Sequence, residues 1–241
     1  MQRTPDSLRA LLANLIDYAG LYPPAALPLS EVLDHYQAYL ASPEVWMLNR
    51  IVLPAARLPE APLGKDWRVT LLVDAEPGPL PAQVETLETK LPRRLSLPTY
   101  CEAPIDTIHG AFAKVRTGGL TPEAIPTSDA LAEFLSEAAA RRMAFKATAG
   151  LHHPMRTTMH GFVNVFVAAM FAWRGVERGL LLDVLNETNP QSFDFRDGEL
   201  RWRGRGISTA GIASARRDFA HSFGSCSFAE PVADLRHLGF L

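Results

Sequence analysis

Along the chain, short runs of hydrophobic residues alternate with segments in which hydrophobic residues recur at helical spacing. This pattern predicts short strands separated by helices. Short apolar runs bounded by turn residues are typical of buried strands. We predict such strands at 15–21, 45–54, 67–75, 93–103, 112–119, 145–150 and 179–187. The segment 81–91, PAQVETLETKL, is amphipathic and fits either a strand or a helix.

Helical spacing is clearest at 128–143, where the apolar positions 131, 134, 135, 138 and 139 follow Ser128, a candidate N-cap. The pattern predicts further helices at 30–42, 161–173 and 207–224. Ser208 or Thr209 would cap the last of these. The apolar residues at the end of the chain, from Phe228 to Leu238, also recur at helical spacing.

The alternation of strands and helices predicts βαβ units and a parallel sheet with helices packed outside. About eight strands in 241 residues is the count of a closed (β/α)8 TIM-like barrel, so we predict a single domain over 1–241. A doubly wound open sheet is the alternative. It is disfavoured because the sequence has no GxGxxG after a first strand and no GxxxxGK[ST]. The connection 119–127 is long enough to be an active-site loop.

Composition excludes several classes of partner. The net charge of −2 provides no basic field for nucleic acid or an anionic membrane surface. No apolar run reaches the roughly 18 residues that span a bilayer, and the N-terminal region does not fit a signal peptide. The two cysteines, Cys101 and Cys226, form no CxxC pair, which favours a reducing cytoplasm. The apolar segment 161–173 leaves a homo-oligomer open.

Cationic residues occupy two consecutive predicted strands. Because side chains alternate along a strand, Lys114 and Arg116 share one face, and Lys146 and Thr148 share the corresponding face of the next strand. We expect this polar set to point into the barrel near the carboxyl ends of the strands, where barrel enzymes collect catalytic groups. The alternative is that these cations point outward and snorkel between the helices.

An inward cation needs a partner or must lose its proton. Candidate partners near the ends of other strands are Asp17, Asp74, Glu102 and Glu187. Repulsion among Lys114, Arg116 and Lys146 would push one lysine toward the neutral amine. A neutral amine can form an iminium with an aldehyde or ketone, while the other cations hold a phosphate or carboxylate. The same residues also suit an anion site without covalent chemistry.

Polar residues at other predicted strand ends supply further candidates. His152 and His153 follow the turn at Gly150, and His152 is our candidate general acid–base group. Both histidines could instead only cap the loop by hydrogen bonding. Asp17 ends the first predicted strand and is a candidate for proton transfer or charge balance, or caps the following turn.

Arg50 is a strand cation suited to an ion pair or a ligand contact, and Arg156 could bind an anion or be an exposed loop residue. Either Asn186 or Glu187 should face the mouth at the end of 179–187. The sequence has no HxH or HExxH spacing, so we predict no metal and no cofactor.

The segments AKVRTGG (113–119) and FKATAGLHH (145–153) resemble the two lysine-bearing strands of class I aldolases of the deoxyribose-phosphate aldolase type. The resemblance implies a Schiff-base role for Lys114 and an assisting role for Lys146, which lowers the pKa of the first lysine. Val115 and Arg116 depart from the small hydroxyl residues of that motif, and LHHP replaces its glycine-rich phosphate turn. The set RTGG, FKATAGLHHP and FGSCSFAEP also resembles an uncharacterised bacterial barrel-like family, which implies no activity.

Two hypotheses of function follow. The first is a cytoplasmic lyase that acts on a small anionic carbonyl compound at the barrel mouth, or an isomerase or hydrolase that uses the same mouth without an imine. The second is a non-catalytic small-anion-binding or interaction protein. The predicted catalytic residues are Lys114, Lys146, Asp17 and His152, and the predicted substrate-binding residues are Arg50, Arg116, Thr148, His153, Arg156, Glu102 and Asn186.

Overall fold

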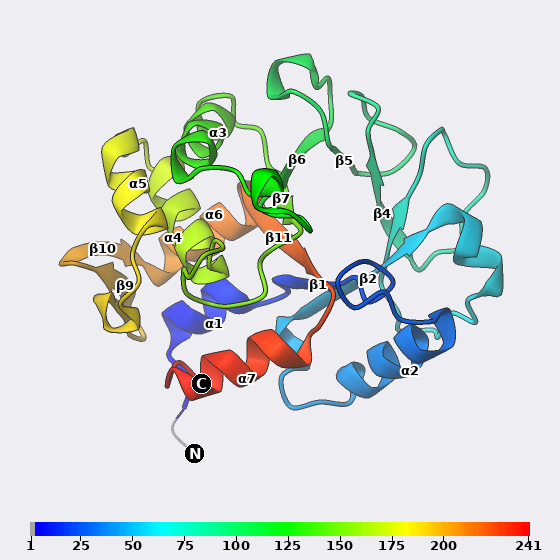
Figure 1. The fold of residues 1–241 in the computed structure, drawn as a ribbon, viewed down its shortest axis with the longest axis horizontal. Helices are drawn as coiled ribbons and strands as arrows, with labels where there is room; N and C mark the ends of the chain where they lie inside the picture. The colour runs from blue at the N-terminus through cyan, green and yellow to red at the C-terminus, as the bar shows by residue number, and fades with distance from the viewer. Residues whose placement is uncertain (1–2) are drawn as a thin grey trace.

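Eight parallel strands close into a barrel in a computed structural model that describes residues 3–241 (Figure 1). Around the ring, the order is β1-β2-β3-β4-β5-β6-β7-β11, so each strand lies beside its neighbour along the chain until the long excursion between β7 and β11. This confirms the predicted TIM-like barrel. The barrel strands are β1 (Ile16–Tyr18), β2 (Leu48–Pro54), β3 (Val69–Leu72), β4 (Val84–Thr89), β5 (Thr99–Cys101), β6 (Phe112–Arg116), β7 (Phe145–Thr148) and β11 (Ala220–Ser225).

Helices cover mainly one side of the barrel (Figure 1). They are α1 (Asp6–Leu12), α2 (Leu29–Leu40), α3 (Ser128–Ala140), α4 (Phe162–Trp173), α5 (Arg178–Leu185), α6 (Thr209–Asp218) and α7 (Ala229–His237). Within residues 3–241, no helix is both long and apolar enough to cross a membrane. Short 3-10 turns are η1 (Val45–Met47), η2 (Ala55–Glu60), η3 (Ile105–Thr107), η4 (Pro122–Ala124) and η5 (Pro190–Ser192).

The arc from β2 to β6 departs from the predicted alternation, because no α-helix of the described chain lies in it. Prolines recur along this arc from Pro54 to Pro104, and proline inside a helix removes a hydrogen bond and clashes with the preceding turn. Loops and 3-10 turns therefore connect the strands here, and Leu71 and Leu87 on these strands are nevertheless buried.

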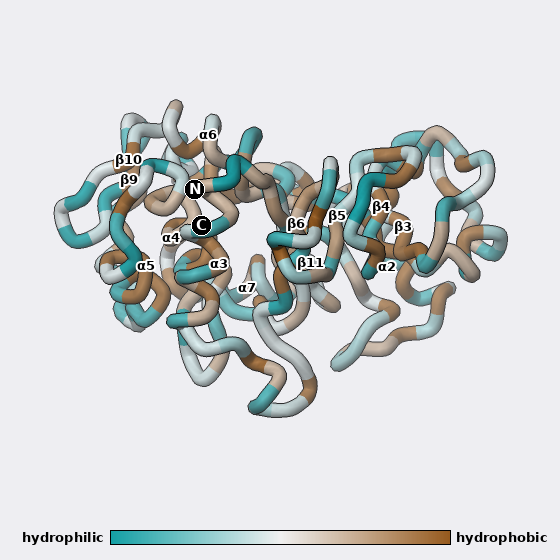
Figure 2. The backbone as a smooth tube through the Cα atoms, turned by 90° about the horizontal axis from the view of Figure 1, so that it is seen from above, coloured by the Kyte–Doolittle hydropathy of each residue, from teal (hydrophilic) through white to brown (hydrophobic). Residues whose placement is uncertain are grey.

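For two segments the predicted secondary structure is wrong. The segment 179–187 forms α5 rather than a strand, with Leu181, Val184 and Leu185 buried along one side. The predicted helix 207–224 ends early: α6 gives way to β11, which supplies the eighth strand. Between α5 and α6 lies an unpredicted antiparallel sheet of β8 (Phe193–Phe195), β9 (Glu199–Trp202) and β10 (Arg205–Ser208), whose outer turn is largely hydrophilic in Figure 2.

The register between β6 and β7 aligns the two lysine-bearing strands. Lys114 lies opposite Lys146 and Arg116 opposite Thr148, so these side chains share one face, as predicted. Beyond the strands, Gly118 and Gly150 pass so closely that a Cβ at Gly118 would lie 2.8 Å from the Gly150 Cα. Only glycine fits this contact, and it joins the carboxyl ends of β6 and β7.

Candidate active site

Lys146 lies at the centre of a buried ion network inside the barrel. Its side chain is 1% exposed, and its Nζ lies 2.5 Å from Asp17 Oδ2 and 2.5 Å from Glu88 Oε1. Asp17 also accepts hydrogen bonds from Ser222 Oγ at 2.8 Å and from the backbone N–H of Arg50 at 3.1 Å. These contacts join β1, β2, β4, β7 and β11, so the inward orientation predicted for Lys146 is correct.

Lys114 extends the same network toward the mouth. Its Nζ lies 2.8 Å from Glu88 Oε2 and 3.1 Å from Glu102 Oε2. Glu102 also pairs with Arg116 through its other oxygen at 3.4 Å. Glu88 therefore bridges the two lysines, with one carboxylate oxygen on each.

The carboxylates change the electrostatics that the sequence suggested. Burial opposes the charged form of Glu88, but the ammonium groups of Lys146 and Lys114 outweigh it and lower its pKa to about 2. Burial also favours the neutral amine of Lys146, but Asp17 and Glu88 outweigh this and raise its pKa. The expectation that repulsion among the cations drives Lys146 toward the neutral amine is wrong, because a carboxylate lies between each neighbouring pair of cations.

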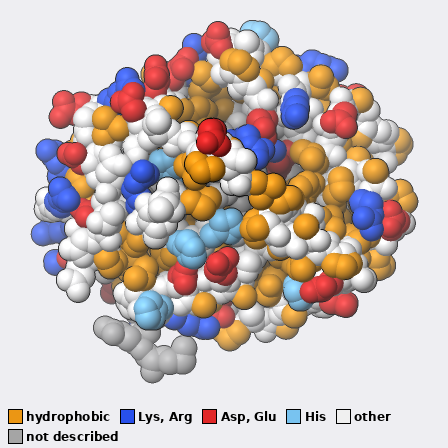
Figure 3. All heavy atoms as spheres, in the orientation of Figure 1, with side chains coloured by type: hydrophobic (Ala, Val, Ile, Leu, Met, Phe, Trp, Pro, Cys, Tyr) orange, Lys and Arg blue, Asp and Glu red, His pale blue; other side chains and the backbone are white. Residues whose placement is uncertain are grey.

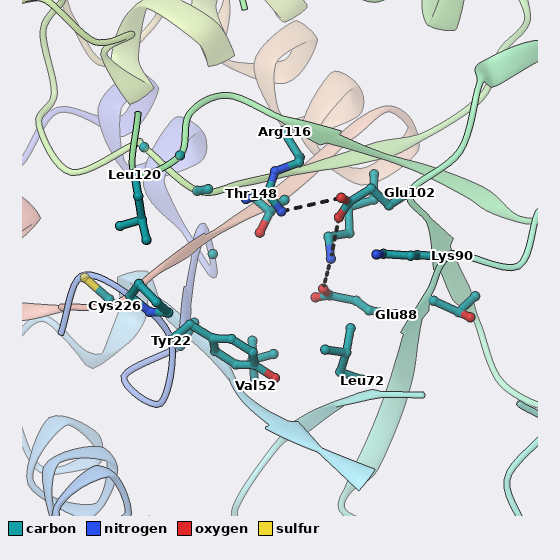
Figure 4. A pocket seen from close by; sticks show the side chains of 18 of the residues that line it. Tyr22, Val52, Leu72, Glu88, Lys90, Glu102, Arg116, Leu120, Thr148 and Cys226 are labelled. Carbon is teal, nitrogen blue, oxygen red and sulfur yellow. Dashed lines mark hydrogen bonds and ion pairs between the residues drawn. The ribbon is translucent and has the colours of Figure 1, made fainter. Parts of the chain in front are cut away.

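A cavity of about 360 Å³ opens above this network. In Figure 4, Tyr22, Val52 and Leu72 lie along one side of it, and Glu102 and Arg116 lie across from them. The space-filling view likewise shows charged side chains at a hollow bordered by hydrophobic ones (Figure 3). The polar and charged side chains that line the cavity are those of Tyr22, Asp74, Glu88, Thr89, Lys90, Glu102, Lys114, Arg116, Thr148, His152 and Cys226.

The charges that line the cavity balance. The three acidic side chains are those of Asp74, Glu88 and Glu102, and the three cationic ones are those of Lys90, Lys114 and Arg116. Asp17 and Lys146 are absent from the lining and form a pair below it. No strong net field attracts an anion, so selectivity must come from the local placement of individual charges.

His152 and Cys226 form a contact at the rim of the cavity. Cys226 Sγ lies 3.8 Å from His152 Nδ1, and Glu230 Oε2 lies 3.6 Å from the same nitrogen. Burial raises the pKa of the Cys226 thiol, which keeps it protonated at neutral pH. His152 Nε2 makes no hydrogen bond within residues 3–241, which leaves this nitrogen available for a ligand.

Besides Asp17 and Lys146, four of the predicted site residues lie outside the lining, and these four also take no part in the lysine network through their side chains. The Arg50 side chain pairs with Glu85 at 2.7 Å, below the central network. His153 pairs with Asp234 at 2.5 Å, and Arg156 donates to His160 at 2.9 Å.

Asn186 follows helix α5, where it accepts a hydrogen bond from Ser128 Oγ at 2.7 Å. Its neighbour Glu187 pairs with Arg203 at 2.8 Å. The expectation that one of these two residues ends a barrel strand and faces the mouth is wrong, because 179–187 is not a strand.

Sequence reasoning missed Glu88, Ser222 and Tyr22. Glu88 was missed because the sequence left 81–91 open between a strand and a helix. The every-second-residue spacing of Val84, Thr86 and Glu88 fits side chains on one face of a strand. Ser222 lies in a segment predicted to be helical. Tyr22 follows the first strand in AGLYPP, and its place after a strand end was the available signal.

No group of three or more His, Cys, Asp or Glu side chains in residues 3–241 is arranged to hold a metal ion. Comparison with family models, curated proteins and solved structures found no match to the chain. A barrel of this kind is compatible with an enzyme, and the site itself must supply any further argument for function.

Proposed function

We propose that the cavity is the active site of a Schiff-base lyase that acts on a small anionic carbonyl compound, with Lys114 as the nucleophile. The observation that carries this proposal is the position of Lys114. Its amine borders the cavity between two carboxylates, whereas Lys146 lies below, outside the lining. A substrate can therefore reach Lys114 but not Lys146.

Activation of Lys114 requires transfer of a proton to a neighbouring group, because an ammonium is not a nucleophile. Glu102 is the acceptor: its oxygen lies 3.1 Å from the amine, and its side chain is 22% exposed toward the mouth. Glu88 is a poorer acceptor because its pKa is lowered to about 2, by the two lysines against the opposing effect of burial. Lys146 competes with Lys114 for Glu88 and so weakens the hold of this carboxylate on the nucleophile.

The neutral amine of Lys114 attacks the carbonyl carbon, and the resulting carbinolamine loses its oxygen as water to give an iminium. The iminium becomes an enamine either by loss of a proton from the adjacent carbon, or by cleavage of the bond from that carbon to a hydroxyl-bearing carbon, which loses its hydroxyl proton and leaves as an aldehyde. His152, at the rim, accepts the proton in either case and returns one to the enamine carbon, which restores the iminium. Addition of water to the iminium releases the product and restores Lys114.

The anionic group of the substrate is assigned to Arg116 and Lys90. The Arg116 side chain is 52% exposed and holds Glu102 by a single contact at 3.4 Å, so most of its donors are free. Lys90 also borders the cavity and makes no ion pair within residues 3–241. Two cations suit one carboxylate or phosphate rather than a polyanion, in keeping with the balanced charge of the lining.

A second candidate, proton transfer without an imine, is favoured by the resting state of the lysines. Each lysine contacts two carboxylates, and those beside Lys146 raise its pKa against the effect of burial. In that case Glu102 or His152 would exchange protons with the substrate directly. Lys114 would then hold the substrate as a charged donor.

Proton exchange in D2O tests the proposal and separates these two chemistries. The protein is incubated with pyruvate, hydroxyacetone or acetaldehyde, and loss of the protons next to the carbonyl is followed by NMR. We expect exchange to fall at least about 100-fold in Lys114→Ala, since no iminium can form. Lys90→Ala, which removes another lysine of the same cavity, should retain exchange with acetaldehyde.

Exchange that persists in Lys114→Ala would contradict the imine and favour direct proton transfer. Absence of exchange with the whole panel in the wild-type protein would leave the proposal without support and favour a binding protein.

A further inference from the structure

Tyr22 has a buried hydroxyl with no partner. Its ring borders the cavity, but its oxygen is shielded from solvent and makes no hydrogen bond within residues 3–241. The other deeply placed tyrosines differ: Tyr36 donates to the carbonyl of Asn49 at 3.1 Å, and Tyr100 bonds His221 at 2.8 Å. A buried polar group without a partner is costly and calls for an explanation.

The loop that carries Tyr22 is fixed by backbone hydrogen bonds. The Tyr22 N–H donates to the carbonyl of Ala19 at 3.0 Å, and the Ala26 N–H donates to the carbonyl of Tyr22 at 3.0 Å. A third bond, from Leu27 N–H to the Gly20 carbonyl at 2.9 Å, closes the loop. The phenol is therefore held at the cavity by its backbone, and its lack of a partner does not reflect a loose segment.

Apolar side chains lie beside Tyr22. Val52 and Leu72 lie on the same side of the cavity as Tyr22 (Figure 4), while Glu88, which lies opposite Leu72 on the neighbouring strand, is close enough to raise the pKa of the phenol. The Tyr22 hydroxyl is thus an unpaired polar atom between an apolar part of the wall and the ion network. Small-molecule sites use such isolated polar groups to fix the orientation of a ligand.

We propose that the Tyr22 hydroxyl hydrogen-bonds a hydroxyl group that the substrate carries on the carbon next to its carbonyl. This inference rests on the proposed function, because it takes Lys114 as the partner of the carbonyl carbon. The substrate is then an α-hydroxy carbonyl compound with an acidic group at its other end, near Arg116 and Lys90. Contact requires the Tyr22 side chain to move, since its oxygen is shielded from solvent.

The protonation state of Tyr22 suits this role. Burial, with a smaller effect from Glu88, raises the pKa of the phenol, so it stays neutral at physiological pH. A neutral phenol both donates and accepts a hydrogen bond, as a substrate hydroxyl does. It cannot serve as a base, which leaves proton transfer to the opposite side of the cavity.

A matched pair of probes tests the inference. 3-Hydroxypyruvate and pyruvate share a ketone and a carboxylate and differ by the hydroxyl next to the carbonyl. Dissociation constants are measured by calorimetry or ligand-observed NMR for the wild-type protein, Tyr22→Phe and Tyr39→Phe. Tyr39 lies outside the cavity lining and controls for the loss of a tyrosine hydroxyl.

We expect wild type and Tyr39→Phe to bind 3-hydroxypyruvate about tenfold more tightly than pyruvate. Tyr22→Phe should bind the two probes equally, with pyruvate affinity unchanged. Equal binding of both probes by the wild type, a preference that survives in Tyr22→Phe, or no binding of either probe would each overturn the inference.

Borohydride treatment of the same samples separates this inference from the proposed function. A Tyr22-dependent preference without any reducible adduct would contradict the imine alone. An adduct that forms equally with both probes would contradict the role of Tyr22 alone.

Discussion

Alternating acidic and basic side chains form the ion network of the site. From the interior outward, Asp17, Lys146, Glu88, Lys114 and Glu102 follow one another as acid and base. Lys146, Glu88 and Lys114 each have two oppositely charged neighbours, which compensates for the cost of burial. Removal of one member leaves its neighbours uncompensated, so each position has a measurable effect on stability.

Glu88→Gln should lower the free energy of unfolding by about 3–5 kcal/mol, because it leaves two buried ammonium groups with one counter-charge fewer. Urea denaturation measures this change. The control is Glu60→Gln, which removes an exposed ion pair with Arg57 and should cost less than about 1 kcal/mol. Equal, small effects of both substitutions would contradict the bridging role of Glu88.

The same carboxylate predicts a loss of stability in acid. Two ammonium groups lower the pKa of Glu88 to about 2 in the folded protein, against the opposing effect of burial, from an ordinary value of 4.5. The folded state therefore binds fewer protons, and the contribution is complete above about pH 4.5 and is lost as the pH falls toward 2. The stability difference between wild type and Glu88→Gln should shrink by about 2 kcal/mol between pH 5 and pH 3. A stability difference between the two proteins that stays constant from pH 5 to pH 3 would contradict the lowered pKa of Glu88.

Among the elements, those with a clear period were predictable and those without one were not. The spacing in 128–143 identified α3 apart from its end and its cap, which is Thr127 rather than Ser128. By contrast, the apolar run at 179–187 has no feature that separates a strand from a buried helix, and it forms α5. Only one residue separates α6 from β11, and the sequence pattern predicts a single helix over both. Ser222 was missed for this reason.

The junction between α6 and β11 depends on Arg216. This side chain is half-buried and donates to the carbonyls of Ala220, His221 and Ala13, while burial lowers its pKa to about 10. Arg216→Met should lower the free energy of unfolding by about 2–3 kcal/mol, because buried carbonyls lose their donor.

Arg217→Met is the matched control at the next position. Its side chain is 69% exposed, and its removal should change stability by about 0.5 kcal/mol or less. Chemical denaturation of both variants measures the two effects. A cost at Arg216 no larger than that at Arg217 would contradict the structural role of this junction.

The whole molecule is a closed barrel with helices over one part of its circumference and loops over the rest. The closure was predictable from the count and alternation of strands. The absence of α-helices between β2 and β6 did not follow from the alternation of strands, although the prolines of this region disfavour helices. The ion network could be anticipated only in part, since Lys114, Lys146, Asp17 and Glu102 lie at strand ends but their pairing depends on the closed ring.

This uneven cover predicts uneven protection from hydrogen exchange. The amides of α4, which is buried along almost its whole length, should exchange at least about 1000-fold more slowly than those of the loop 73–83. Segments with few buried apolar contacts open at lower free energy. Peptide-level exchange measured by mass spectrometry checks this, and similar protection of the two segments would contradict the half-covered barrel.

The most direct test of the central claim is to locate the lysine that reacts. The protein is treated with borohydride together with 3-hydroxypyruvate, pyruvate or acetaldehyde, and the adduct is mapped by peptide mass. We predict that a reducible adduct forms on Lys114 and that Lys146, which lies outside the cavity lining, carries none. An adduct on Lys146 or Lys90 in place of Lys114, or no adduct with any of these carbonyl compounds, would contradict the account.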